Sequence, residues 1–120
     1  MILKKLSFLL IGSGGYIAPR HVKAISAVGG ELIGCVDIDF SAEALNMLPK
    51  DVLRTSSISE FISIFKEPID YMVVCSPNFL HEEHIKEGLS LNFNVISEKP
   101  VALNTEGIEN LILSESKSEG

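Results

Sequence analysis

The chain has 120 residues, of which 46% are hydrophobic and 22% are charged, and its formal net charge is −6 at pH 7. This length and composition are typical of one globular domain and exclude a disordered chain. An acidic chain without clustered Lys and Arg lacks the positive surface that nucleic acid requires, so no nucleic-acid partner is expected.

The N-terminal residues and the cysteines indicate the compartment. Lys4 and Lys5 precede an apolar run that is too short for a secretory signal, and no small-residue cleavage site follows it. No apolar stretch reaches the ~18 residues that a membrane span needs. Cys35 and Cys75 lie at the ends of apolar runs and are interpreted as reduced core thiols. We therefore expect a cytoplasmic protein with no membrane partner.

A glycine-rich turn follows the first apolar run, residues 6–11, which is interpreted as a buried strand. A strand, a tight glycine turn and a helix form the geometry that binds the pyrophosphate of a dinucleotide. The N–H groups and the dipole at the start of the helix attract the phosphates. The residues predicted to bind the cofactor here are Gly12, Gly14, Gly15, Tyr16 and Ile17.

An apolar stripe predicts the first helix. Pro19 is tolerated only in a first turn, so this helix is expected to begin near Gly15 or Tyr16. Gly29 and Gly30 are expected to end it. The stripe consists of Ala18, Val22, Ile25 and Val28.

Asp37 closes the second predicted strand, residues 31–36, and lies twenty residues beyond Ile17. A dinucleotide-binding unit carries at about this distance the acid that accepts hydrogen bonds from the adenosine ribose. A carboxylate there repels a 2′-phosphate, so NAD is favoured over NADP. Asp39 is a nearby alternative, and the plainer interpretation of Asp37 is a turn acid.

The rest of the chain alternates strands and helices. Asn78 is expected to cap the helix that ends at Leu91, and Asn104 or Thr105 the last helix. Predicted strands lie at residues 52–54, 70–75 and 92–97, and predicted helices at 41–48, 57–66, 78–91 and after 104.

This alternation predicts an α/β fold, a Rossmann-type doubly wound parallel sheet with helices on both faces. In such sheets ligands bind at the carboxyl ends of the strands. The chemically notable groups follow predicted strands, so they are expected to share one edge of the sheet. They are the glycine turn, Asp37, the Ser76-Pro77-Asn78 turn and the Glu98-Lys99-Pro100 segment.

These segments resemble the N-terminal nucleotide-binding domain of the glucose-fructose oxidoreductase, inositol dehydrogenase and MocA-type oxidoreductases. The most specific matches are residues 74–81, with Ser-Pro-Asn followed by His81, and residues 95–100, which end in Glu-Lys-Pro. The resemblance covers essentially the whole chain. Within the family, residues 15–21 resemble the loop of the bacterial UDP-N-acetylglucosaminuronate 3-dehydrogenases, which act in lipopolysaccharide O-antigen synthesis.

The glycine loop departs from the usual family spacing. Counted from Gly12, the third glycine position holds Ile17, whereas counted back from His21 it holds Ala18. The loop therefore carries one extra residue. Ala18 lies on the apolar stripe, so we assign it the third-glycine role of close helix packing, and which glycine lies nearest the phosphates stays open.

The resemblance implies roles for the later motifs. Lys99 is expected near the substrate, where it takes part in proton transfer or orients the reacting hydroxyl. Glu98 is expected to contact the nicotinamide ribose or to hold Lys99. The remaining assigned residues are Ser76, Pro77 and Asn78 along the cofactor, and His81 at the cofactor or substrate, with packing against the helix as the alternative for His81.

The resemblance also implies NAD-dependent oxidation of a sugar or nucleotide-sugar hydroxyl by hydride transfer. Family members continue into another strand and a second, mostly antiparallel domain that carries much of the substrate site. We therefore expect residues 1–120 to be the NAD-binding domain, truncated before the last strand and before that C-terminal α+β domain. Alone it is expected to be inactive, and the full-length protein is expected to form a homo-oligomer.

Other interpretations are weaker. His81 and His84 are three residues apart and lack the spacing of a metal motif, so no metal is expected. Arg20 is either a surface charge or a group that reaches a substrate anion. A non-catalytic NAD-binding or assembly module is the main alternative. An S-adenosylmethionine methyltransferase shares the glycine loop, but Glu-Lys-Pro after the fifth strand disfavours it.

Overall fold

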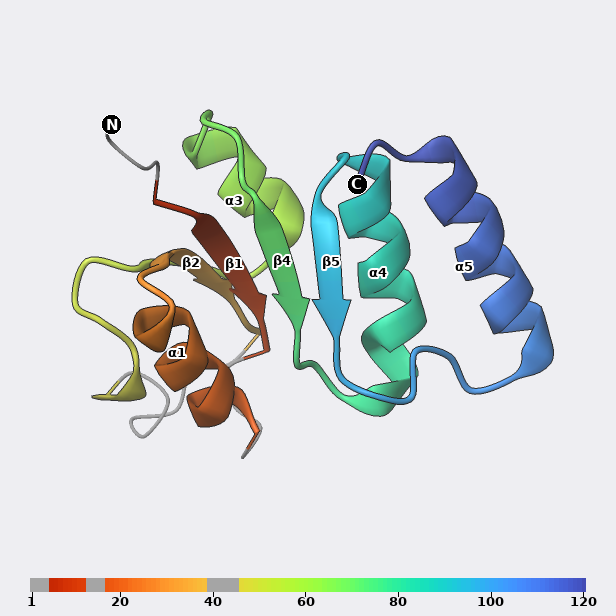
Figure 1. The fold of residues 1–120 in the computed structure, drawn as a ribbon, viewed down its shortest axis with the longest axis horizontal. Coiled ribbons are helices and arrows are strands. Elements are labelled where there is room, and N and C mark those ends of the chain that lie inside the picture. Colours follow the sequence, from red (N-terminus) through yellow and green to blue (C-terminus); the bar gives the residue numbers. More distant parts are fainter. Residues whose placement is uncertain (1–4, 13–16, 39–45) are drawn as a thin grey trace.

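Five parallel strands form the centre of the molecule (Figure 1). In this computed structural model, residues 5–12, 17–38 and 46–120 are described. The spatial order of the strands is β3-β2-β1-β4-β5, so the chain moves outward from β1 to β3 and then crosses back to β4. This is the doubly wound sheet that the sequence predicts. The strands are β1 (Ser7–Ile11), β2 (Glu31–Val36), β3 (Leu53–Thr55), β4 (Tyr71–Val74) and β5 (Asn94–Ser97).

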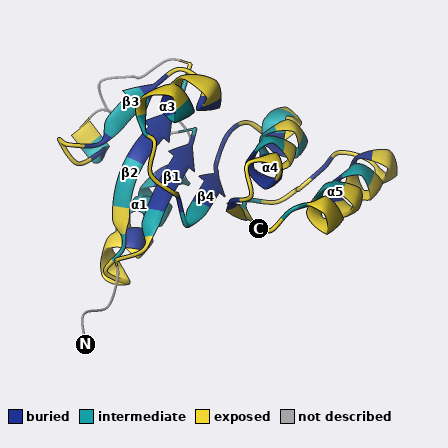
Figure 2. Ribbon diagram, turned by 90° about the horizontal axis from the view of Figure 1, so that it is seen from above, coloured by how far each residue is buried: buried dark blue, intermediate teal, exposed yellow. Residues whose placement is uncertain are grey.

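Helices cover both faces of the sheet. Alternate residues of a strand point to opposite faces, so β1 sends Phe8 and Leu10 to one core and Leu9 and Ile11 to the other. The first core lies under α1, and the second lies under α3 and α4. Figure 2 shows β1 and β4 at the centre of the sheet mostly buried and the outer faces of the helices exposed. The helices are α1 (Ala18–Ala27), α3 (Ile58–Ile64), α4 (His81–Ser90) and α5 (Thr105–Lys117), with a 3-10 turn at Asn78–Leu80 before α4.

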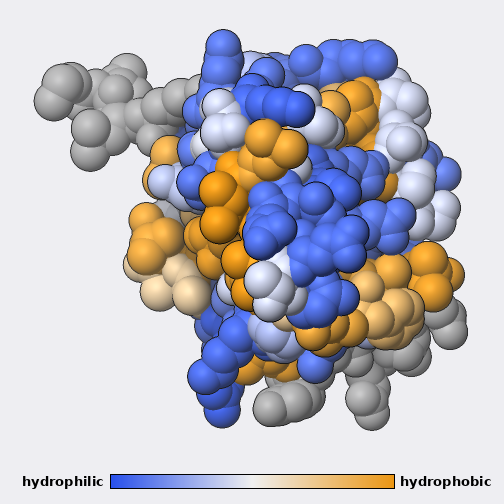
Figure 3. Space-filling view, turned by 90° about the vertical axis from the view of Figure 1, so that its right-hand side faces the viewer, coloured by the Kyte–Doolittle hydropathy of each residue, from blue (hydrophilic) through white to orange (hydrophobic). Residues whose placement is uncertain are grey.

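The helix α5 lies beside α4, beyond the β5 edge (Figure 1). Asn104 caps it as predicted, because its side-chain oxygen accepts a hydrogen bond from the Gly107 N–H at 2.8 Å. Leu111 is buried against α4, whereas Ile108 and Ile112 are exposed. In Figure 3, which faces this side of the molecule, hydrophobic groups flank a hydrophilic centre.

The first helix begins later than the sequence predicts. It starts at Ala18, with Ile17 at the N-cap position and Pro19 in its first turn. Pro19 has no N–H, and the Arg20 N–H already donates to the Ile17 carbonyl at 3.1 Å. This turn therefore offers fewer free donors than expected. Val28 is also not part of the buried stripe, since it follows the helix and is 72% exposed.

Two other local predictions need correction. Asn78 does not cap the helix after β4, because a 3-10 turn intervenes and neither segment has a side-chain cap. The helix predicted over 57–66 covers only Ile58–Ile64, with Ser57 as its cap. The predicted helix 41–48 falls mostly outside the described residues.

Cys35 and Cys75 are free and buried, as predicted. None of the helices in the described part of the chain has the length and apolar character needed to span a bilayer.

Candidate functional site

The floor of the site is main chain, at the point where the topology reverses between β1 and β4. Gly12 continues β1 beyond its last residue and donates to the Val36 carbonyl at 2.7 Å. Its φ is +85°, and a Cβ there would stand 2.7 Å from both Cα and N of Ser76. Only glycine allows this approach, so Gly12 and Ser76 bring the β1 and β4 ends together.

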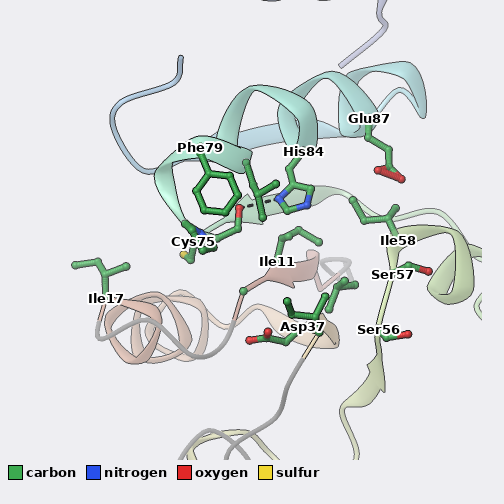
Figure 4. Close-up of a pocket in the computed structure, with 16 residues that line it drawn as sticks. Ile11, Ile17, Asp37, Ser56, Ser57, Ile58, Cys75, Phe79, His84 and Glu87 are labelled. Carbon is green, nitrogen blue, oxygen red and sulfur yellow. Dashed lines mark hydrogen bonds between the residues drawn. The ribbon is translucent and has the colours of Figure 1, made fainter. Parts of the chain in front are cut away.

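A cleft of about 580 Å³ opens above this floor (Figure 4). Its volume is within the ~300–1,000 Å³ range of small-molecule and cofactor sites. It lies at the carboxyl ends of β1, β2 and β4, which is where open α/β sheets bind ligands. The lining residues are Ile11, Gly12, Ile17, Val36, Asp37, Ile38, Ser56, Ser57, Ile58, Cys75, Ser76, Pro77, Phe79, Leu80, His84 and Glu87.

Five residues assigned to the cofactor from the sequence line this cleft: Gly12, Ile17, Asp37, Ser76 and Pro77. Asp37 follows β2, and its N–H donates to the Thr55 carbonyl at 3.0 Å, which fixes it at the strand end. Gly14, Gly15, Tyr16 and the alternative acid Asp39 lie outside the described residues. The sheet therefore brings the described part of the glycine turn, the β2 acid and the β4 turn to one place.

His81 is placed differently. Its ring is 1% exposed, and it does not line the cleft. Nε2 lies 2.6 Å from the Ser76 carbonyl and Nδ1 lies 2.7 Å from the Pro100 carbonyl. Both nitrogens are thus engaged with main chain, and the ring joins the loops that follow β4 and β5. The alternative of a packed helix residue describes this placement better than contact with a cofactor.

Glu98 pairs with a residue that the sequence interpretation did not connect to it. Its Oε1 lies 2.6 Å from Nε2 of His21, on the first turns of α1. The Glu98 N–H also donates to the Val74 carbonyl at 3.1 Å, so the end of β5 is tied to both β4 and α1. The role of Glu98 toward the nicotinamide ribose or toward Lys99 stays a prediction.

Asn78 and Lys99 are exposed, and neither lines the cleft. Lys99 follows Glu98 beyond the end of β5, at the same edge of the sheet as the cleft. Its assignment as a catalytic group stays a prediction.

Sequence reasoning missed the residues that α4 and the β3 end contribute. His84 and Glu87 reach the cleft from α4, and Ser56 and Ser57 follow β3. The two serines could have been found by applying the strand-end rule to the third predicted strand. His84 was considered only as a metal ligand. In the described residues no group of three or more His, Cys, Asp or Glu could hold a metal ion.

Burial shapes the electrostatics of the cleft wall. The Ser76 hydroxyl lies 2.7 Å from Nδ1 of His84. Desolvation lowers the pKa of His84. The nearby Glu83 carboxylate opposes this shift, and His81 adds to it. Desolvation and then Glu83 raise the pKa of Glu87. Burial, with Glu98 and Cys35, raises the pKa of Cys75 to about 12, so this thiol stays protonated and is a poor nucleophile.

Comparison with known proteins gives the family. The profile of the GFO/IDH/MocA group, described as an oxidoreductase family with an NAD-binding Rossmann fold, matches residues 6–119. The chain belongs to this family. Its cofactor is NAD, and the floor at Gly12 and the acid at Asp37 fit that dinucleotide.

Several proteins similar to this chain are dehydrogenases that act on sugars or bind nucleotide sugars. Glucose-6-phosphate 3-dehydrogenase of Bacillus subtilis is 33% identical over 108 residues, which are 87% of this chain and 28% of that protein. The WlbA (WbpB) dehydrogenase of Thermus thermophilus, solved with NAD and UDP-GlcNAcA, is 34% identical with a TM-score of 0.82. That match covers 94% of this chain and 39% of the Thermus chain.

A third relative carries the same pair of ligands. The WlbA dehydrogenase of Chromobacterium violaceum, solved with NADH and UDP-GlcNAcA, is 26% identical with a TM-score of 0.81. The match covers 98% of this chain and 34% of that one. This chain therefore spans less than two fifths of the length of these GFO/IDH/MocA relatives.

Proposed function

We propose that this chain is the NAD-binding part of a dehydrogenase that oxidises a sugar hydroxyl, with a UDP-N-acetyl-hexosaminuronic acid as substrate class. The observation that carries the proposal is the cleft at the β1–β4 crossover, with Gly12 and Ser76 as its floor and Asp37 at its side. The substrate class is supported by the WlbA dehydrogenases that bind UDP-GlcNAcA.

Bound NAD supplies the hydride acceptor. In the proposal, the Asp37 carboxylate accepts hydrogen bonds from the adenosine ribose and disfavours a 2′-phosphate by repulsion. Gly12 and the start of α1 receive the pyrophosphate. Asn78 lies beside the cofactor, and Lys99 moves or orients the proton of the reacting hydroxyl.

The wider setting is also proposed. Nucleotide-sugar oxidation of this kind belongs to lipopolysaccharide precursor synthesis in the cytoplasm, and the whole enzyme acts as a homo-oligomer. In the proposal this chain works together with a separate substrate domain, since the relatives are more than twice as long as the part that it matches.

Titration calorimetry of the chain with NAD, NADP and S-adenosylmethionine tests the cofactor part. NAD is expected to bind tightest, and Asp37→Ala is expected to weaken NAD about 10-fold or more, the worth of a hydrogen bond to a charged group. Asp51→Ala is the matched control, because Asp51 is an exposed acid that does not line the cleft. Tighter binding of NADP than of NAD would overturn the role of Asp37.

The substrate part needs the protein purified from its natural source. NADH formation is followed with UDP-GlcNAcA, glucose 6-phosphate and myo-inositol as alternative substrates. Turnover is expected with UDP-GlcNAcA and not with the other two, and Lys99→Ala is expected to reduce it by about 100-fold or more. Preferential oxidation of glucose 6-phosphate or inositol would refute the nucleotide-sugar assignment.

A further inference from the structure

Two side chains of α4 reach the cleft and have no role so far. His84 and Glu87 are three residues apart, which places them on one face of the helix. In Figure 4 Glu87 extends from α4 toward Ile58 on the opposite wall, and the His84 ring turns toward the Ser76 hydroxyl with which it shares a hydrogen bond. Neither is needed to hold the sheet together, since the α4 residues in the core are Ile85 and Leu89.

Their position along the cleft indicates which part of a dinucleotide they meet. Ile17 marks the glycine-turn end, Asp37 lies in the middle, and Ser56 and Ser57 mark the other end (Figure 4). With the pyrophosphate at the glycine turn and the ribose at Asp37, the adenine base extends to the far end. Glu87 is beside that end, and His84 lies next to Glu87 on the side toward Phe79 (Figure 4).

The walls at this end suit a flat aromatic ring. Ile38, which directly follows Asp37, is 90% exposed although it is a large apolar residue that lines the cleft. Covering such a side chain with a ligand removes apolar surface from water, which contributes favourably to the free energy of binding. Ile58 is buried and also lines this end of the cleft, so both apolar and polar side chains meet a ligand there.

The polar groups at this end are the His84 ring, whose orientation is fixed by a hydrogen bond, and the Glu87 carboxylate, which acts as an acceptor. Ser76 engages Nδ1 of His84, so Nε2 is the ring atom left for a ligand. The low pKa of His84 keeps the ring neutral at pH 7. The Glu87 carboxylate is half-buried beside it and offers only acceptors when ionised.

We propose that Glu87 accepts a hydrogen bond from the exocyclic amine of adenine, and that His84, oriented by Ser76, packs against the same base. Glu87 therefore selects the base of the dinucleotide, and His84 adds affinity for it without distinguishing one base from another. The inference rests on the proposed function, namely that this cleft holds NAD with its ribose at Asp37.

The test compares NAD with nicotinamide hypoxanthine dinucleotide, in which an oxo group replaces the amine. The wild-type chain is expected to bind NAD about 10-fold more tightly, because the oxo group meets the carboxylate without a donor. In Glu87→Gln the carboxamide donates as well as accepts, so the ratio is expected to fall to about twofold or less. Glu109→Gln is the control, since Glu109 is an exposed acid on α5 that does not line the cleft.

The role of His84 is tested separately. His84→Ala is expected to weaken both dinucleotides about 5-fold and to leave their ratio unchanged, because packing does not distinguish the two bases. Ser76→Ala is expected to change the nitrogen NMR shifts of the His84 ring, which shows that Ser76 acts by orienting it. Unchanged His84 shifts in Ser76→Ala would remove that positioning role.

The outcomes separate the two proposals. If neither dinucleotide binds the wild-type chain, the proposed function fails. If NAD binds but hypoxanthine dinucleotide binds equally well, and Glu87→Gln changes nothing, NAD binding stands and the assignment of Glu87 is overturned.

Discussion

The two ends of the sheet use their polar side chains in different ways. At the amino ends of β1 and β4, Ser7 and Asp70 bind each other. Asp70 Oδ2 accepts from the Ser7 N–H at 2.8 Å and from its hydroxyl at 3.2 Å, and the Asp70 N–H donates to Ser7 Oγ at 3.0 Å. At the carboxyl ends, Asp37, His84 and Glu87 line a cleft instead.

This difference separates stability from binding within one sheet. The Ser7–Asp70 cluster closes the amino end, and Asn94 joins it by donating to the Asp70 carbonyl at 3.1 Å. Polar groups that satisfy one another stabilise the fold. Groups that line a cleft can contact a ligand as well as their protein partners. We therefore expect substitutions at the two ends to affect different measurements.

The largest effect is expected at Gly12, where the two roles coincide. Gly12→Ala places a Cβ 2.7 Å from the Ser76 main chain and at a φ of +85°. We expect a loss of roughly 3–5 kcal/mol in the free energy of unfolding, from the strained backbone and the overpacking together. Urea unfolding followed by circular dichroism measures it.

Gly29→Ala is the matched control for Gly12. Gly29 also has a positive φ, +74°, but nothing lies within 4 Å of a Cβ there. The Gly29→Ala variant is expected to lose only about 1 kcal/mol in the free energy of unfolding, because only the backbone is strained there. Equal losses at the two glycines would show that the contact with Ser76 is unimportant.

A smaller effect is expected at the closed end. Asp70→Ala leaves the Ser7 N–H and hydroxyl without their carboxylate partner, so about 2 kcal/mol of stability should be lost. The affinity for NAD, measured by calorimetry below the unfolding transition, should stay within about twofold of the wild type, because the site is at the other end of the sheet. A large loss of affinity would show that the amino end of the sheet also influences NAD binding, which contradicts the separate roles of the two ends.

The smallest effect is a pH dependence that arises at the open end. The pKa of His84 is lowered in the fold, so the unfolded chain takes up a proton more readily as the pH falls through about 6.5. Stability from His84 is therefore complete above that pH and declines below it. Since the ring is only half-buried, the change should be under about 1 kcal/mol.

The variant His84→Gln isolates this dependence. It should lose less stability than the wild type between about pH 7.5 and pH 5.5. The raised pKa of Glu87 acts in the opposite sense, because acidification relieves its burial penalty, and both proteins retain it. A variant that follows the wild-type curve would exclude His84 as the source.

Most of the fold could be predicted from local patterns. All five strands were predicted, since strands buried on both faces read as apolar runs, as in residues 6–11 and 70–75. The first residues of the helices were predicted less accurately. The position of Asn78 predicts a cap, but Asn78 is instead the first residue of the 3-10 turn, and Pro77 precedes it. Pro19 and Ile17 delay α1 in a way that spacing alone does not reveal.

The site was predicted only where residues follow strands. Asp37, Ser76 and Pro77 were found because strand ends converge in a parallel sheet. His84 and Glu87 lie within a helix, and only the packing of α4 against the sheet brings them to the cleft. The pair His21–Glu98 joins residues 77 apart in the chain, and no local pattern predicts such a contact.

The main-chain floor formed by Gly12 and Ser76 has a consequence for redesign. Because peptide groups rather than side chains make this surface, its shape is insensitive to which amino acids stand around it. A mutant library that varies Asp37, Ile38, His84 and Glu87 would alter cofactor preference while leaving the scaffold intact. A new coenzyme could thus be introduced by exchanging the walls alone.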